Sequence, residues 1–377
     1  MRTSGEDRIG RPILSLTMCL AAIVAGCGGE VPEAGSNADG GSGSGSSANK
    51  RIVILTNGDN PFWDPCEAGA MEAATELKLE EAGFTVSFER ANFTVKGQVD
   101  KLKQYGLATD IVGIGISVYD DSSPAIANEL KKLQEAGIKI VTIDGDIDRE
   151  RFRDVRFAYL GTDNVIGGRE LGRAAADLRP EGGKYATFVG NKGNSNARAR
   201  ISGFAEGAGD KFDEVESLDD GGKPEVARKM VRDALDRHPE IDTLVGIWAY
   251  NGPAAIQIVT ERKLRDKTSI LTFDADEASI KGMGEGNLDA MVVQNPFNMG
   301  YQGVRILKAL VEDDQEVIKE MYPNHGEPDG DLFRTGLKVV IPNEGSPLQK
   351  DAFDSQTEFL KLDEFKAWLK KYNLKSS

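Results

Sequence analysis

From residue 51 onward, short runs of β-branched and other apolar residues alternate with longer runs of helical periodicity. The first run, 51–56 (RIVILT), has no polar alternation, which is typical of a strand covered on both faces. Strand, helix and strand at this spacing predict right-handed βαβ units and parallel sheets. A chain of 377 residues exceeds the roughly 250–300 residues that one core supports, so we expect an α/β protein with two lobes.

The alternation can be placed along the chain. The predicted strands are 51–56, 85–91, 110–117, 139–144, 158–161, 184–190, 243–249, 269–275, 290–294 and 336–342. The predicted helices are 64–81, 96–107, 124–136, 164–178, 196–208, 224–237, 252–263, 278–284, 297–312 and an amphipathic helix near 363–372.

Residues 1–26 are predicted to be a secretory signal peptide. Three arginines make the start basic, and the apolar run 13–25 that follows is shorter than the about 20 residues of a membrane-spanning helix. Small residues directly before Cys27 resemble a bacterial lipoprotein signal, in which that cysteine is lipidated and becomes the mature N-terminus. An ordinary signal peptide with an incidental cysteine is the alternative.

Residues 27–50 are predicted to be a flexible tether. Positions 28–50 hold seven glycines and five serines and no apolar run, so they cannot bury a core. The chain has three cysteines, of which only Cys66 lies beyond the signal and its lipidation site. We therefore expect Cys66 to be a small buried or helix-surface thiol without a disulfide partner in the same chain.

Polar and aromatic side chains follow the predicted strands, where each strand ends. In an open parallel sheet, ligands bind at the carboxyl ends of the strands. A sugar presents hydroxyls that donate and accept hydrogen bonds and C–H faces that are apolar, so its site needs paired polar groups and planar rings. The strand exits supply the rings of Phe62, Trp63, Trp248, Tyr250 and Phe273, and the polar groups of Asn60, Asp144, Arg198, Asn251, Asp274 and Gln294.

The same strand exits carry a family resemblance. The strand 51–56 followed by Asp59-Asn60-Pro61-Phe62-Trp63 resembles the opening of ribose-type periplasmic sugar-binding proteins, the type I substrate-binding proteins of bacterial ABC importers. Similar motifs follow in the family's order over about 51–345. They are Thr142-Ile143-Asp144, Gly161-Thr162-Asp163-Asn164 with Gly167-Gly168, Ala197-Arg198-Ala199-Arg200 with Gly203-Phe204, Ala249-Tyr250-Asn251, Phe273-Asp274 and Val293-Gln294.

The resemblance implies two Rossmann-like lobes with parallel sheets, joined by a three-crossing hinge that closes on the ligand. The N-terminal lobe is then 51–162 plus 295–320, the C-terminal lobe 163–294 plus 321–345, and 346–377 a C-terminal extension, with crossings near residues 162, 294 and 320. The implied ligand-binding residues are Asn60, Phe62, Trp63, Asp144, Arg198, Asn251, Asp274 and Gln294. Further candidates are Thr56, Ser117, Trp248, Tyr250 and Phe273. Arg200, two positions beyond Arg198, is expected to point away from the site.

Three positions depart from the family pattern. Gly145 stands where an arginine often follows the first-lobe aspartate, and Ser117 stands where asparagine is common. An aromatic residue expected around position 220 is absent from Asp219-Asp220-Gly221-Gly222. These departures leave the ligand open among pentoses, hexoses and polyols.

Other features argue against catalysis and cofactors. The formal net charge of −15 disfavours nucleic acid as a partner, and no P-loop, GxSxG or HExxH motif occurs. Asp144, Asp146 and Asp148 alternate like the start of a calcium loop, but Arg149 occupies the position that needs glycine. We therefore expect no cofactor, no metal and no enzymatic activity.

We interpret the chain as a solute-binding lipoprotein, anchored to the membrane in the periplasm or at the cell surface. It would capture a small sugar-like ligand as a monomer and deliver it to the permease of an ABC importer. A sugar sensor that feeds a chemoreceptor or a membrane kinase is the alternative. A glycosidase that uses Asp144 and Asp274 as its carboxylate pair is a weaker hypothesis, and a repressor is disfavoured by the signal peptide and the acidic charge.

Overall fold

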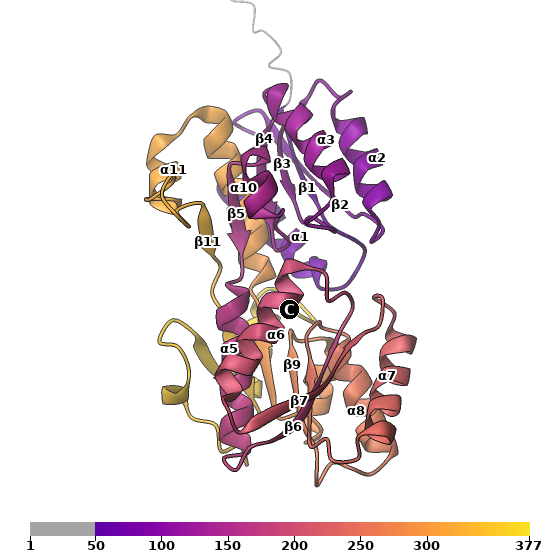
Figure 1. Cartoon of the computed structure of the whole chain (residues 1–377). Coiled ribbons are helices and arrows are strands. Elements are labelled where there is room, and N and C mark those ends of the chain that lie inside the picture. The colour runs from indigo at the N-terminus through magenta and orange to yellow at the C-terminus, as the bar shows by residue number, and fades with distance from the viewer. Residues whose placement is uncertain (1–49) are drawn as a thin grey trace, which may run out of the picture. The chain divides into compact units, whose positions relative to one another are not determined.

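The computed structural model describes residues 50–377, which form two sheets with helices on both faces of each (Figure 1). The predicted signal peptide, the lipidation site Cys27 and the tether up to residue 49 lie outside the described residues. Within 50–377, none of the helices combines the length and the apolar character needed to cross a bilayer.

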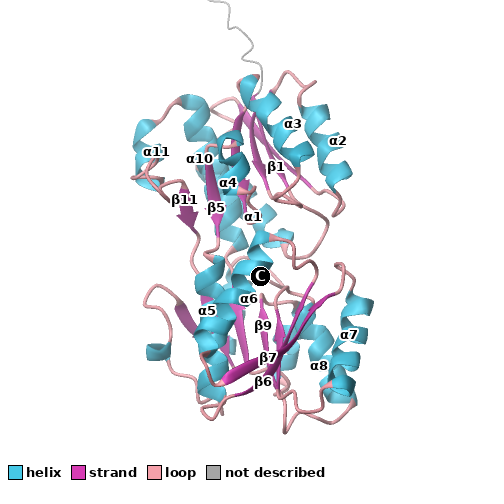
Figure 2. Ribbon diagram, viewed as in Figure 1, coloured by secondary structure: helices cyan, strands magenta, loops and turns pink. Residues whose placement is uncertain are grey.

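The N-terminal lobe is built on six parallel strands in the order β11-β5-β4-β3-β1-β2. The strands are β1 (Lys50–Leu55), β2 (Phe84–Glu89), β3 (Ile111–Ile116), β4 (Lys139–Ile143), β5 (Ala158–Gly161) and β11 (Leu332–Arg334). Helices α2 (Val95–Tyr105) and α3 (Pro124–Glu135) cover one face, and α1 (Trp63–Glu76), α10 (Pro296–Glu312) and α11 (Gln315–Met321) cover the other (Figure 2). A short helix, α4 (Arg149–Phe152), lies between β4 and β5.

The C-terminal lobe is built on seven strands in the order β13-β12-β10-β9-β8-β6-β7. The strands are β6 (Gly183–Val189), β7 (Phe212–Asp219), β8 (Thr243–Gly246), β9 (Ser269–Phe273), β10 (Ala290–Val293), β12 (Lys338–Ile341) and β13 (Glu358–Lys361). All neighbours are parallel except β10 and β12. Helices α5 (Asn164–Leu178) and α6 (Ser195–Ala208) cover one face, and α7 (Pro224–Arg237), α8 (Asn251–Glu261), α9 (Glu277–Gly284) and α12 (Leu362–Lys371) cover the other.

Close helix packing fixes the position of α6, which carries part of the site described below. A Cβ atom on Gly168 of α5 would lie 2.2 Å from the carbonyl oxygen of Arg200 on α6. Only glycine therefore lets the two backbones approach this closely. In the other lobe, Gly300 of α10 packs in the same way on the carbonyl of Cys66. The expectation of a buried free thiol at Cys66 is confirmed, and burial raises the pKa of that thiol.

The parallel α/β class and every strand and helix predicted above appear in the structure, but β7, β11, β13, α4 and α11 were not predicted. Strand β7 (FDEVESLD) is an edge strand that leaves charged side chains partly exposed, so it lacks the apolar signal of the central strands. Strand β11 pairs with β5, so the assignment of all of 321–345 to the C-terminal lobe is wrong. The third crossing follows Arg334 instead of lying near residue 320. The segment 346–377 packs on the second lobe, where β13 adds a strand to the sheet.

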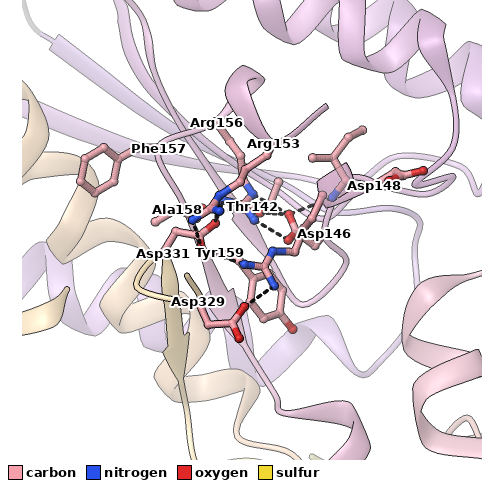
Figure 3. Close-up of polar contacts among 12 residues, drawn as sticks. Thr142, Asp146, Asp148, Arg153, Arg156, Phe157, Ala158, Tyr159, Asp329 and Asp331 are labelled. Atoms are coloured by element: carbon pink, nitrogen blue, oxygen red, sulfur yellow. Dashed lines mark hydrogen bonds and ion pairs between the residues drawn. The ribbon is translucent and has the colours of Figure 1, made fainter. Parts of the chain in front are cut away.

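An ion-pair network attaches β11 to the first lobe (Figure 3). Asp331, only 3% exposed at its side chain, accepts hydrogen bonds from Arg149 at 2.9 Å, from Arg153 at 2.8 Å and from Arg156 at 2.7 Å. Arg156 also donates to both carboxylate oxygens of Asp146, at 2.7 and 2.6 Å. Burial alone would raise the pKa of Asp331, but the guanidinium groups outweigh it, so this pKa lies below its usual value.

Candidate ligand-binding site

One cavity is lined by side chains from both lobes, at the carboxyl ends of their strands. The first lobe contributes Asn57, Asn60, Phe62, Trp63, Phe93, Tyr119 and Asp144. The second lobe, together with the crossing after β10, contributes Asn194, Asn196, Arg200, Trp248, Ala249, Tyr250, Asp274 and Gln294. Eight of these fifteen residues are site candidates from the sequence, so the strand-exit argument located the cavity.

Two aspartates occupy equivalent places in the two lobes. Asp144 follows β4 and Asp274 follows β9, and both are buried. Their φ angles are 61° and 63°, in the left-handed region that aspartate tolerates better than most residues. This turn takes each aspartate out of its strand while its N–H still bonds the neighbouring strand, at 3.0 Å to Leu160 O and 2.8 Å to Val292 O. Both carboxylates line the cavity as a result.

Burial dominates the electrostatics of the two aspartates. It raises the pKa of Asp144 to about 6, with Asp274 adding to the rise while Arg200 and a hydrogen bond from Ser117 oppose it. Burial also raises the pKa of Asp274, and the charge of Arg200 and the bonds from Gln294 oppose that rise. Gln294 Nε2 donates to the two carboxylate oxygens of Asp274 at 3.0 and 3.1 Å. Hydrogen-bond donors of a ligand would therefore stabilise the charged form of both carboxylates.

Arg200 is the cation of this cavity, and the expectation that it points away is wrong. Its guanidinium lies 4.0 Å from the ring centre of Phe273 and 3.9 Å from an oxygen of Asp274. It also donates to Asn164 Oδ1 at 2.9 Å and to Ile247 O at 3.1 Å. Residues four apart share one face of a helix, so Asn196 and Arg200 line the cavity together.

Arg198, two residues earlier, lies outside the cavity lining. Its side chain is 57% exposed and contacts Asp121 of the first lobe at 3.2 Å. It also donates to the carbonyl of Gly193. The motif contains both arginines, and only the helical phase determines which of them lines the cavity.

Aromatic rings form the apolar part of the lining. Phe62 and Trp63 pack edge to face with ring centres 5.0 Å apart, and Phe93 and Tyr119 do so at 6.3 Å. The second lobe adds Trp248 and Tyr250. Phe93 and Tyr119 were missed in the sequence, as were Asn57, Asn194 and Asn196. Phe93 and Tyr119 lie beyond the last residues of β2 and β3, in the loops to the next helices, where only a search of whole loops would have found them.

Several buried polar atoms around the cavity have no hydrogen-bond partner within the described part of the chain. Two are donors, Arg200 Nη2 and Trp248 Nε1. Three are acceptors, Asn57 Oδ1, Asn196 Oδ1 and Gln294 Oε1. A buried polar atom without a partner costs about 1–3 kcal/mol. A ligand that both donates and accepts hydrogen bonds would satisfy this mixed set.

Asn251 does not line the cavity and instead supports it. Its Oδ1 accepts from Trp248 N at 3.0 Å, and its Nδ2 donates to Asp220 Oδ2 at 2.8 Å. The hydroxyl of Tyr250 also donates to Asp220. Asp220, at the position where the family pattern led us to expect an aromatic residue, therefore holds the loop that presents Trp248 and Tyr250.

The other candidates from the sequence lie just behind the lining. Thr56 donates to Gly58 O at 2.6 Å, and Ser117 contacts the carboxylate of Asp144 at 3.5 Å. Phe273 is buried beneath Arg200. Over residues 50–377, no group of three or more His, Cys, Asp or Glu side chains is placed to hold a metal ion.

A fold with two parallel α/β lobes and a polar and aromatic cavity between their strand ends defines a type I periplasmic binding protein. The chain belongs to the periplasmic binding proteins, because residues 51–315 match the periplasmic binding protein domain. The ribose import binding protein of Salmonella typhimurium is 23% identical over 277 residues, which cover 72% of this chain and 87% of the relative.

Two further comparisons agree in fold and extent. The D-allose-binding periplasmic protein of Escherichia coli is 25% identical over 270 residues, covering 68% of this chain and 82% of the relative. The crystal structure of an ABC transporter solute-binding protein from Burkholderia graminis, in complex with D-arabinose, superposes with a TM-score of 0.67. It is 23% identical and covers 82% of this chain and 98% of its own.

Proposed function

We propose that this protein is an extracytoplasmic solute-binding lipoprotein that captures a monosaccharide or related polyol between its lobes and delivers it to an ABC importer. The observation that carries the proposal is the cavity itself, where unpartnered donors and acceptors alternate with aromatic rings. A sugar offers hydroxyls to the first and C–H faces to the second. The names of the relatives, which bind ribose and D-allose, support the same class of ligand.

The charges of the cavity favour an uncharged ligand. Its lining holds two carboxylates, Asp144 and Asp274, and one guanidinium, Arg200. Arg200 already faces Asp274 at 3.9 Å. A phosphate or carboxylate on the ligand would add to this surplus of negative charge, and Arg200 is the one guanidinium in the lining. We therefore expect neutral sugars and polyols to bind and sugar acids and sugar phosphates to be rejected.

Anchoring at Cys27 is the second part of the proposal. It is supported by the small residues before Cys27 and by the Gly- and Ser-rich stretch after it. Labelling of the protein in cells with a radioactive fatty acid, with Cys27→Ser as the control, tests the anchor. Label that persists in Cys27→Ser would contradict it.

A thermal-shift screen of residues 50–377 against pentoses, hexoses, polyols and purine nucleosides tests the ligand class. A ligand that binds only the folded state raises the melting temperature as its concentration exceeds its Kd. We expect one neutral sugar to raise it, and Asp144→Ala and Asp274→Ala to abolish the shift. Asp110→Ala is the matched control, since Asp110 precedes the amino end of β3 and the cavity lies at the carboxyl ends of the strands.

Two outcomes would change the proposal. A shift with a nucleoside, amino acid or peptide, and none with any sugar, would keep the fold and overturn the ligand class. Uptake of the identified sugar by cells that lack the protein tests delivery to an importer. Normal uptake with a lost transcriptional or chemotactic response would favour the sensor.

A further inference from the structure

The segment 372–377 packs against two loops of the ligand-binding site. The N–H of Ala275 donates to Ser377 O at 2.7 Å, and the N–H of Ser377 donates to Ala275 O at 3.1 Å. The hydroxyl of Ser377 donates to Gln294 O at 3.3 Å. Ser377 is only 2% exposed. This one residue therefore bonds the loop after β9 and the loop after β10 at the same time.

These two loops present acceptors and donors to the cavity. Asp274 directly precedes Ala275, and its carboxylate accepts from Gln294 Nε2 at 3.0 and 3.1 Å. The left-handed backbone of Asp274 is strained and persists only where surrounding contacts hold it. Ser377 supplies such contacts on both sides, to the residue after Asp274 and to the carbonyl of Gln294.

The same segment reaches the crossing between the lobes. The ring of Tyr372 lies 4.4 Å from that of Phe297, in the first turn of α10. Helix α10 packs in the first lobe, whereas α12, which leads into Tyr372, places Leu362 and Phe365 in the core of the second. The segment thus contacts both sides of the crossing that follows β10.

We propose that residues 372–377 form a strap that positions Asp274 and Gln294 for the ligand and that full affinity requires it. The proposal rests on the function proposed above. It assigns a role to a part of the chain that lies beyond the match to the family domain, which ends at residue 315.

Point variants separate positioning from general stability. Ser377→Ala removes one hydrogen bond to a site loop, and we expect the Kd for the sugar found in the screen to rise about 3- to 10-fold. Ser377→Thr keeps the hydroxyl and is expected to restore the Kd. Phe359→Ala removes a partly buried ring of β13 that packs on the second-lobe core. It should lower the melting temperature and leave the Kd unchanged.

Amide hydrogen exchange followed by NMR reads the strap without any ligand. We expect the Ala275 amide to be protected in the ligand-free protein and to exchange at least tenfold faster when Ser376 and Ser377 are deleted. A Kd unchanged by both Ser377→Ala and the deletion would overturn the strap. If no sugar binds the unaltered protein, the proposed function fails. The hydrogen exchange of the Ala275 amide then decides by itself whether the strap exists. An Ala275 amide that is equally fast with and without the two serines would then overturn the strap.

Discussion

Replacing Asp144 by asparagine should stabilise the ligand-free protein at neutral and alkaline pH. The folded state raises the pKa of this carboxyl from 3.8 to about 6, chiefly through burial. Because the folded pKa is the higher one, the folded state binds the proton more tightly than the unfolded state does. The resulting stabilisation is complete below pH 3.8 and is lost as the pH rises through 6.

The size of the effect follows from the same values. The rise in pKa corresponds to roughly 3 kcal/mol, which the charged carboxylate costs the fold at pH 8. At pH 4.5 the remaining cost is about 1 kcal/mol. Asparagine cannot ionise, so the free energy of unfolding of Asp144→Asn minus that of the unaltered protein should be about 2 kcal/mol larger at pH 8 than at pH 4.5.

Urea unfolding of residues 50–377 without ligand, followed by tryptophan fluorescence at both pH values, measures this difference. Asp110→Asn is the control of opposite sign, because a hydrogen bond from Arg51 lowers the pKa of Asp110. Its exposed pair contributes less than about 1 kcal/mol, lost as the pH falls. A stability difference for Asp144→Asn that does not change between pH 4.5 and 8 would show that folding does not raise the pKa of Asp144. The affinity of Asp144→Asn for the sugar should fall about 5- to 10-fold, since a neutral acceptor replaces a charged one.

Four further substitutions test other parts of the structure. Arg200→Ala should abolish sugar binding and cost about 3–5 kcal/mol of folding free energy, because it leaves the buried carboxylate of Asp274 without its cation. Arg198→Ala removes only an exposed pair with Asp121 and should cost under about 1 kcal/mol in binding and in folding. Titration calorimetry measures the binding and urea unfolding measures the stability. Equal effects of the two arginine substitutions would contradict the assignment of Arg200 to the cavity. Gly145→Ala should cost about 1–3 kcal/mol in urea unfolding, since the new Cβ would lie 2.7 Å from Val118 O, and an unchanged midpoint would show that the loop can yield. Asp331→Asn should cost about 3–5 kcal/mol, because three guanidinium groups lose their shared anion, and a loss below 1 kcal/mol would show that they find other partners.

The sequence was sufficient for the fold because its central strands are continuous apolar runs that end in turn residues. It also predicted that the strand exits lie together, since the carboxyl ends of parallel strands must meet, and several of them line one cavity. Asp144, Asp274 and Gln294 follow from that rule alone. The rule says nothing about helical phase, which is why Arg198 was preferred to Arg200 although α6 presents Asn196 and Arg200 on one face.

What the sequence could not show are contacts between segments far apart in the chain. Asp220 supports the Trp248 loop through Asn251, which lies 31 residues further along the chain. Asn251 had been predicted to bind the ligand from its position after a strand. Strand β11 has three residues and is fixed by ion pairs as much as by its own pattern. Neither its pairing with β5 nor the position of the third crossing has a local signal.

Strand β11 and the residue before it, Asp331, attach the third crossing to the first lobe. Asp331 is held by three guanidinium groups, and the next residue but two, Arg334, bonds Asp163 at the start of α5 at 2.8 Å. The ion pair between Arg334 and Asp163 therefore links the third crossing to the first. Beyond Arg334, Gly336 has a φ of 81°, in the left-handed region that favours glycine, and a Cβ atom there would meet no atom within 4 Å. If the lobes close as the resemblance to the family implies, we expect the third crossing to bend beyond Arg334, close to Gly336.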